Sequence, residues 1–262
     1  MSEQFDIVKE VQVGFDALFA SGGGGDRYGG GDGGSIGGGG ASDLSHPYHR
    51  LEKAAVLQDA RIFHDDKIVR EHPRRCVTIL AQLLRLRDLV AAGGGGKDYN
   101  ENEALEIFFG ATKLFVSNDA SLRRMVYLFI KDICALVDPA SVIIVTSSLT
   151  KDMTCDIDLY RANALRVLCR IIDASMLSAI ERYVKQAIVD SSPVVSSAAL
   201  VSAAHLSSSD PECGSIVRRW VGEAAVAIES QNGMVQFHAV GLMYSIRCRD
   251  RLGVSKIVQQ YG

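Results

Sequence analysis

The 262-residue chain carries 28 Lys and Arg against 31 Asp and Glu, which gives a formal net charge of −3 and a pI near 6.1. This weakly acidic balance argues against a nucleic-acid-binding protein, because such proteins usually carry a strong basic excess. With 47% hydrophobic residues the chain can bury a large core, and its five prolines and 7% aromatic residues favour helices over strands.

The first 45 residues form two predicted segments before the repeat pattern begins. Residues 1–20 predict a short N-terminal segment, with helix as one option, and five charged side chains among them argue against the apolar stretch of a secretory signal. Residues 21–45 predict a disordered linker, because thirteen glycines lie between Ser21 and Gly40 and glycine costs the most entropy to order. No apolar run in the sequence approaches the ~20 residues that span a bilayer.

A second glycine tract, Gly93–Gly96, precedes Lys97 and raises the alternative of a phosphate-binding loop. That motif requires GxxxxGK followed by Ser or Thr, so that backbone N–H groups surround the phosphates and the hydroxyl meets magnesium. Here Ala91 occupies the first glycine position and Asp98 follows Lys97. We therefore predict a loop between helices, with no nucleotide and no other cofactor.

A helical repeat follows. Apolar runs with three- and four-residue spacing start at the anchor residues Leu122, Tyr160, Val195 and Val235, each after a polar or turn-forming stretch. The intervals between these anchors are 38, 35 and 40 residues. Two short helices and two turns fill such a period, as in HEAT and armadillo arrays. The polar or small residues that follow the anchors are Arg123, Arg161, Ser196 and Gln236.

This pattern predicts an all-α fold, a right-handed α-solenoid of HEAT- or armadillo-like helical hairpins. Each hairpin is too short to bury its apolar face alone, so it is stable only when it stacks on its neighbours. We expect the solenoid to occupy residues 46–262, with regular helices from about Leu51 onward. Asp119, Asp138 and Asp190 stand near expected helix ends, where their side chains suit capping.

Residues with catalytic or metal-binding chemistry are scattered. The six cysteines form no CxxC pair and have no histidine at ligand spacing, so we expect reduced thiols and no metal site. His205 and His238 stand inside apolar helical runs, where a hydrogen-bonded structural imidazole is more common than a catalytic one. Ser147 and Ser148 lack the GxSxG context of a hydrolase nucleophile. We predict no catalytic residues, and a protein that is not an enzyme.

Six segments, taken in sequence order, resemble the coatomer gamma subunit family, within the wider group of adaptin and coatomer large subunits. The resemblance covers some four-fifths of the chain, from about His46 to Gly262. No single segment is a chemical signature, but six long matches in order are specific. The segments are HRLEKAAVLQDARIF (49–63), SLRRMVYLFIKDI (121–133), IIVTSSLTKDM (143–153), AIERYVKQAIVD (179–190), VVSSAALVSAAHL (194–206) and MVQFHAVGLMYSIRCRDRLGVSK (234–256).

The resemblance implies the adaptin-like N-terminal trunk of a structural COPI coat subunit, acting in Golgi-to-ER and intra-Golgi vesicle-mediated protein transport. The partners it implies are the zeta subunit, other coatomer subunits and an Arf-family GTPase in its GTP state, and no nucleic acid. It further implies a cytoplasmic protein that associates peripherally with the Golgi membrane and with COPI-coated vesicles. Because the family's trunk continues beyond this length, we expect a fragment or a truncated gene product, with apolar surface on its last helices.

The resemblance also places GTPase contacts on a helix expected at residues 141–151. Ile143 and Thr146, with Ser147 at the edge, are predicted to touch the GTPase. The alternative is that Ile143 is buried by the next helix. The residues that share the stripe expected to face the core are Val142, Val145 and Leu149.

Two other features are weaker candidates for partner contacts. Basic residues offer a surface for anionic lipids or acidic partners, although solvated faces and internal ion pairs are the more common role. Trp220 either fills the core or anchors a partner, and packing is the commoner outcome. The basic residues in question are Arg123, Arg124, Arg218, Arg219, Arg247, Arg249 and Arg251.

The alternative function is a stand-alone helical-repeat adaptor or an importin-like peptide receptor. Such receptors normally need repeated tryptophans.

Overall fold

The computed structural model describes residues 51–91, 98–248 and 250–261. Every regular element in these ranges is a helix and none is a strand, which confirms the predicted all-α class. The predicted segments 1–20 and 21–45 and the glycine tract at 93–96 lie outside the described residues. In chain order the elements are α2 (Lys53–Asp59), η1 (Ala60–His64), α3 (Asp66–Glu71), α4 (Pro73–Ala91), α5 (Glu101–Lys113), η2 (Leu114–Val116), α6 (Ala120–Ile133), α7 (Pro139–Met153), α8 (Asp158–Ile171), α9 (Ala174–Ile188), α10 (Pro193–Ser209), α11 (Pro211–Val217), η3 (Arg218–Trp220), α12 (Val221–Ile228), α13 (Gly233–Arg247) and α14 (Arg251–Tyr261).

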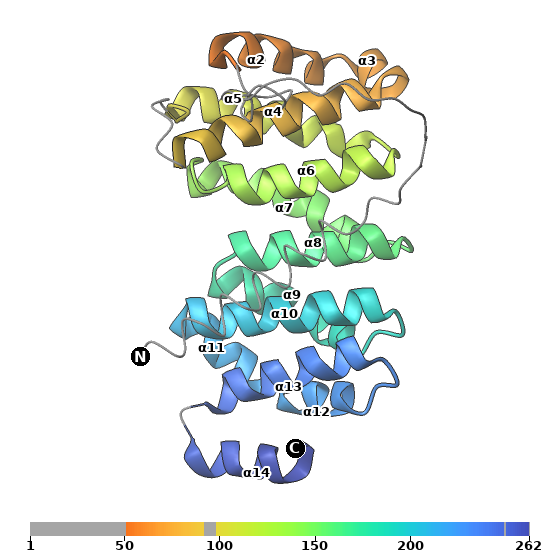
Figure 1. Ribbon diagram of the computed structural model, residues 1–262, viewed down its shortest axis with the longest axis vertical. Helices are drawn as coiled ribbons and strands as arrows, with labels where there is room; N and C mark the ends of the chain where they lie inside the picture. The colour runs from red at the N-terminus through yellow and green to blue at the C-terminus, as the bar shows by residue number, and fades with distance from the viewer. Residues whose placement is uncertain (1–50, 92–97, 249, 262) are drawn as a thin grey trace, which may run out of the picture. The chain divides into compact units, whose positions relative to one another are not determined.

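The helices stack as hairpins in two layers. Helices α4, α6, α8, α10 and α13 contact one another in succession and form the first layer, which can be followed down Figure 1. Each helix of the second layer packs on the first-layer helix that follows it in the chain, so that α5 contacts α6, α7 contacts α8, α9 contacts α10 and α12 contacts α13. This arrangement confirms the predicted α-solenoid of helical hairpins.

The four anchor residues mark the repeat in three dimensions. Leu122, Tyr160, Val195 and Val235 are each the third residue of a first-layer helix, in α6, α8, α10 and α13 respectively. All four are buried, and they belong to one continuous core. Because these helices contact one another in succession, the interval measured along the sequence is also the repeat of the stack.

The residue that follows the anchor bonds to the end of a second-layer helix in three of the four repeats. Arg123 forms an ion pair with Asp152 near the end of α7, and Arg161 forms one with Asp190 just after α9. Each pair joins residues 29 positions apart. Ser196 instead donates a hydrogen bond of 2.7 Å to the last backbone carbonyl of α9. The two ion pairs are equivalent, because each joins a first-layer helix to the end of the second-layer helix that follows it, whereas Ser196 bonds to the helix that precedes α10.

Helix starts follow capping chemistry. As predicted, Asp119 and Asp138 are N-caps, and their carboxylates accept hydrogen bonds of 2.8 and 3.0 Å from backbone N–H groups of α6 and α7. Asp190 differs from a simple cap, because its carboxylate both binds Arg161 and accepts from the backbone N–H of Ser192 at 2.9 Å in the turn before α10. The sequence pattern located these helix ends correctly.

Candidate partner-binding surface

Helix α7 carries the residues that the sequence analysis assigned to a GTPase contact. Its start is defined by the Asp138 cap and by Pro139, which fits the first helical position because that position needs no N–H donor. The helix extends two residues beyond the expected range 141–151 at each end. Its buried residues are Val142, Val145, Leu149 and Met153, and the first three are those predicted to face the core.

The outward face of α7 is apolar at its centre. Ile143 is 58% exposed, so the alternative in which the next helix buries it is wrong for this structure. Ile144 is 55% exposed beside it. Ser147 is exposed one turn further along, and Thr146 is half-buried at the edge. The structure therefore brings the three predicted residues to one surface and adds Ile144 to it.

Ile144 was not among the predicted contact residues, although the helical period places it on the outward face. Ile144 lies opposite the buried stripe that contains Val142, Val145 and Leu149 when the helix is drawn at 100° per residue. The exposed set formed by Ile143, Ile144, Thr146 and Ser147 is called the α7 patch below.

The hydroxyl groups of the α7 patch are already engaged as donors. Thr146 Oγ1 donates to the backbone oxygen of Ile143 at 2.6 Å, and Ser147 Oγ donates to that of Ile144 at 3.3 Å. Because each hydroxyl proton serves the helix itself, each oxygen offers only lone pairs to a partner. The patch thus presents methyl groups and hydrogen-bond acceptors, which match a partner surface with apolar side chains and N–H donors.

A buried arginine from α6 holds the C-terminal end of α7. Arg123 is 4% exposed, and its guanidinium forms an ion pair with Asp152 and donates to the backbone oxygen of Phe115. Tyr127 donates to the same carboxylate at 2.8 Å. Arg123 is therefore not available to lipids or partners, which confirms for this residue the internal pairing that the sequence favoured over a partner contact. A buried charge of this kind requires its partners in order to be stable.

Three aromatic rings enclose the Arg123 guanidinium. Its central carbon lies 4.3 Å from the ring centroid of Tyr160, 5.0 Å from that of Phe115 and 5.2 Å from that of Tyr127. Burial raises the pKa of Tyr127, so its phenol stays protonated and able to donate to Asp152. Since Tyr160 belongs to α8, this cluster joins α6, α7 and α8 and sets the direction in which the α7 patch points.

The remaining basic residues and Trp220 do not converge on one site. Trp220 is fully buried, and its indole Nε1 donates to Glu181 at 2.9 Å, so it packs in the core as expected. Arg219 is exposed and pairs with the other oxygen of Glu181 at 2.7 Å. Arg124 lies on α6 and Arg247 on α13, at other levels of the stack. Arg249 and the side chain of Arg251 are outside the described residues.

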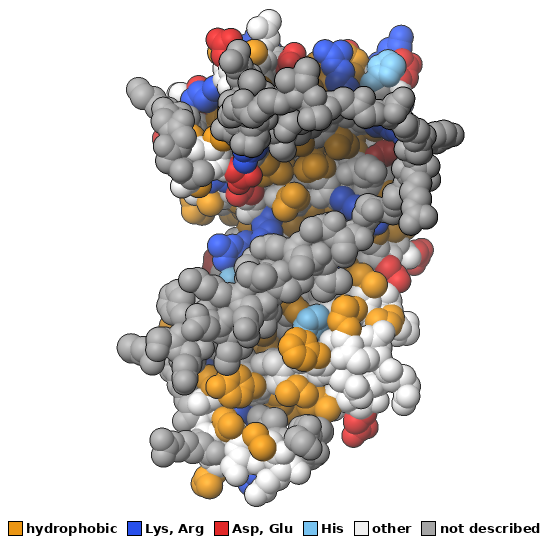
Figure 2. Space-filling model, viewed as in Figure 1, with side chains coloured by type: hydrophobic (Ala, Val, Ile, Leu, Met, Phe, Trp, Pro, Cys, Tyr) orange, Lys and Arg blue, Asp and Glu red, His pale blue; other side chains and the backbone are white. Residues whose placement is uncertain are grey.

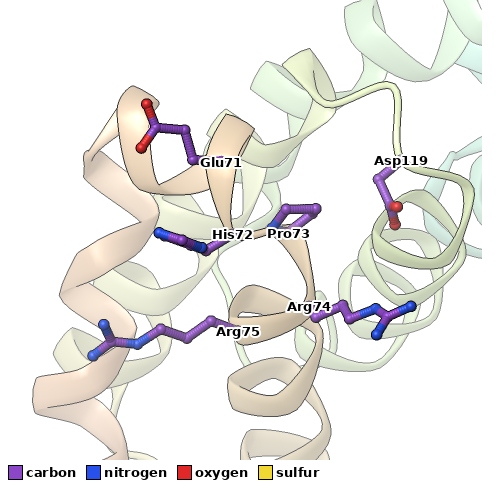
Figure 3. A pocket seen from close by; sticks show the side chains of 6 residues that line it. All are labelled: Glu71, His72, Pro73, Arg74, Arg75 and Asp119. Carbon is purple, nitrogen blue, oxygen red and sulfur yellow. The ribbon is translucent and has the colours of Figure 1, made fainter.

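A shallow hollow of about 620 Å³ lies where α3 meets α4, near the start of α6. It is lined by Glu71, His72, Pro73, Arg74, Arg75 and Asp119. Figure 3 shows that Arg74 and Arg75 point in opposite directions and that the acidic side chains lie on separate elements. Since the charged groups do not converge, the hollow has no geometry for holding one ligand.

The described residues also show how the cysteines are placed. All six are free thiols, three of them buried and three half-buried. Burial raises the pKa of Cys134, Cys169 and Cys213 to about 12, so these thiols are protonated and unreactive near neutral pH.

Among the described side chains, no group of three or more His, Cys, Asp and Glu is arranged to hold a metal ion. None of the described helices combines the length and apolarity needed to cross a membrane.

Comparison with known proteins places these observations in a family. The model of the adaptin N terminal region matches residues 52–261. Coatomer subunit gamma of Arabidopsis thaliana is 53% identical over 212 residues, which are 81% of this chain and 22% of that protein. Coatomer subunit gamma-1 of Bos taurus is 51% identical over 218 residues, 83% of this chain and 23% of that protein. Coatomer subunit gamma-2 of Homo sapiens is 50% identical over 217 residues, with the same shares.

These matches confirm the resemblance drawn from the six sequence segments. The chain spans less than a quarter of the length of the curated relatives it matches. The matched family range coincides with the helices from α2 to α14.

Proposed function

Because this chain belongs to the family of the adaptin N terminal region, we propose that it is a structural subunit of the COPI coat, in the place of a coatomer gamma subunit. The observation that carries the proposal is the 50–53% identity to coatomer gamma subunits across the residues that form the solenoid. The proposed role is assembly in vesicle-mediated transport between the Golgi and the endoplasmic reticulum and within the Golgi, and it involves no catalysis.

In this proposal the α7 patch docks a GTP-bound Arf-family GTPase. The patch is small and only moderately apolar, as is typical of transient signalling contacts. Its engaged hydroxyls favour a partner that brings backbone N–H donors beside apolar side chains. The Arg123 cluster supports the same idea, because its ion pair joins the C-terminal end of α7 to α6, and a preorganised helix lowers the entropic cost of docking.

The other proposed partners are the zeta subunit and further coatomer subunits, bound along the trunk formed by residues 46–262. The protein is then cytoplasmic, and it reaches the Golgi membrane and coated vesicles peripherally through its partners. A helical solenoid suits this work because its stacked hairpins offer long continuous surfaces.

A binding experiment tests the proposal. The purified chain is immobilised and exposed to a GTP-locked Arf-family GTPase, to the same GTPase loaded with GDP, and to the zeta subunit. We expect retention of the GTP form over the GDP form, and retention of zeta. If a folded sample binds neither the GTP form nor zeta, the proposed function is wrong for this chain.

The alternative of an importin-like peptide receptor loses its support in the structure. Such receptors bind peptides with exposed tryptophans in a groove, whereas Trp220, the single tryptophan of the chain, is fully buried. A stand-alone helical-repeat adaptor would be indicated by failure to bind either coat partner in the same experiment.

A further inference from the structure

A run of three serines, residues 207–209, ends helix α10 at an exposed turn. One residue, Asp210, separates this run from the start of α11. Ser208 Oγ donates to two backbone oxygens of the preceding turn, at 2.9 and 3.1 Å. Ser209 is exposed, and within the described part of the chain its hydroxyl makes no hydrogen bond. Ser209 therefore presents its hydroxyl to solvent.

Two carboxylates follow Ser209, at the first and third positions after it. Asp210 caps α11, and its carboxylate accepts from the backbone N–H groups of Glu212 and Cys213, both at 3.1 Å. Glu212 is exposed, and its carboxylate has no ion-pair partner among the described residues. Protein kinases select substrates by such charge patterns, and an acidophilic kinase binds these carboxylates with its own basic side chains.

The backbone leaves the helical conformation immediately after Ser209. Asp210 is extended, with φ −136° and ψ 126°, and its N–H makes no capping bond to the end of α10. Pro211, the next residue, has no N–H to donate. In α9, by contrast, the N–H of Val189 bonds back to the carbonyl of Ala187. The last turn of α10 therefore opens at low cost, which lets a kinase bind the chain around Ser209 in an extended form.

The same spacing of serine and carboxylate occurs at two other described serines, and neither is as well placed. Ser178 precedes Glu181 by three residues, but it lies inside α9 and its Oγ donates to the carbonyl of Ala174 at 2.9 Å. The Glu181 carboxylate is already bound by two side chains of η3. Ser207 is half-buried and has a carboxylate only at the third position. Ser209 combines exposure, an available hydroxyl and two following carboxylates.

A cationic contact lies one helical turn before Ser209. His205 is four residues earlier and on the same face of α10, and helical side chains lean toward the N-terminus, so a group on Ser209 points back toward His205. Arg170, next to the end of α8, places its Nη1 2.7 Å from Nε2 of His205. Both side chains are exposed, and the guanidinium has further N–H donors beyond this one. Figure 2 shows a histidine beside Lys or Arg side chains at one edge of the stack, at the level of α8 and α10 in Figure 1.

From this arrangement we propose that Ser209 is a phosphorylation site for an acidophilic serine kinase, and that the Arg170–His205 pair holds the resulting phosphate. In the transfer, Ser209 Oγ attacks the γ-phosphorus of ATP, the bond from that phosphorus to the β–γ bridging oxygen breaks, and ADP leaves. The hydroxyl proton passes to the catalytic carboxylate of the kinase. The site lies at the end of a first-layer helix and does not depend on the α7 patch or on the proposed function.

The phosphate needs Arg170 because its other neighbours oppose it. It adds a charge of about −1.5 to −2 and three acceptor oxygens. The carbonyl end of α10 and the carboxylate of Asp210 both disfavour a negative group at this position. A guanidinium offers donors that match phosphate oxygens, so Arg170 is the side chain that determines whether the phosphate is held against the fold.

Phosphorylation of the full 262-residue chain tests the site. The folded protein is incubated with ATP and a purified acidophilic serine kinase of the casein-kinase type, and mass spectrometry locates the phosphate. We expect it on Ser209, and Ser209→Ala should abolish the labelling, whereas Ser178→Ala should leave it unchanged. Glu212→Gln should lower the initial rate about tenfold, since one charge-assisted contact with the kinase is lost. Failure to label Ser209 in the folded chain, or equal labelling of Ser178, overturns the proposal.

A second measurement tests the phosphate contact. The phosphorylated chain is treated with alkaline phosphatase, and the loss of phosphate from Ser209 is followed over time. Arg170→Gln should speed this loss about tenfold, because the phosphate is no longer held. Arg182→Gln removes an exposed arginine from α9 in the second layer and should leave the rate unchanged. Circular dichroism checks that each variant is folded. Equal rates for the two arginine variants overturn the assignment of the Arg170–His205 pair to the phosphate.

Discussion

Substituting Ile143 by Asp tests the α7 patch most directly, because the structure predicts a large loss of GTPase binding with little change in stability. Complete burial of an isoleucine side chain contributes about 1.5–3 kcal/mol relative to exposure. Ile143 is 58% exposed in the free protein, so docking can bury about half of its side-chain surface. Burial of that area contributes about 1 kcal/mol to binding. A carboxylate that the partner must desolvate adds about 1–2 kcal/mol. The dissociation constant for the GTP-locked GTPase should therefore rise about 30- to 150-fold.

The free energy of unfolding should change little in the same variant. Exposed positions without special contacts usually change stability by less than about 0.5 kcal/mol. Thermal melts followed by circular dichroism give the stability, and surface plasmon resonance with the GTP-locked GTPase gives the dissociation constant. The combination separates a lost contact from a lost fold.

Two control substitutions complete this test. Val226→Asp places the same charge at a residue of α12 that is 61% exposed, and it should leave GTPase binding intact. Val142→Asp places the charge in the core beside the patch, and it should unfold or strongly destabilise the protein. A stable Ile143→Asp variant that binds the GTPase within twofold of the unsubstituted chain would refute the docking surface.

Three further predictions concern residues that affect the stability of the stacked helices. Arg123→Met leaves a buried carboxylate without its cation and should lower the free energy of unfolding by about 3–5 kcal/mol in urea titrations. Gly214→Ala should destabilise the protein, because a Cβ there would lie 2.9 Å from a backbone oxygen of α10. Gly241→Ala places its Cβ in open space and should stabilise the protein by about 0.5–1 kcal/mol. Thermal melts of the two variants check both outcomes. Burial alone would raise the pKa of Glu103, but the hydrogen bond from Lys53 and the α5 capping box outweigh it and lower the pKa. The ionised Glu103 therefore stabilises the folded protein above its unfolded-state pKa of ~4.3, and this contribution is lost as the pH falls through its lower folded-state pKa. Glu103→Gln should consequently weaken the acid dependence of the free energy of unfolding between about pH 5 and pH 3.

The local features of this protein were determined by its sequence. The three- and four-residue spacing that starts at Leu122, Tyr160, Val195 and Val235 predicted helical runs there, and the structure has a helix at each of them. The same spacing predicted the core stripe of α7, because the helical period alone sets the angle between side chains. Capping at Asp119 and Asp138 was also predictable, since an N-cap bonds within its own first turn.

The tertiary structure alone decided which faces are covered and which charges meet. Helical phase gives a direction but does not say whether a neighbouring helix lies there, so Ile143 and Ile144 were settled as exposed only by the packing of α7. Burial of Arg123 depends on a carboxylate 29 residues away, and the environment of Trp220 depends on one 39 residues away. Arg170 and His205, 35 residues apart, meet because α8 and α10 stack. Such pairs have no local signature, because the energy that selects them arises between helices when the layers form.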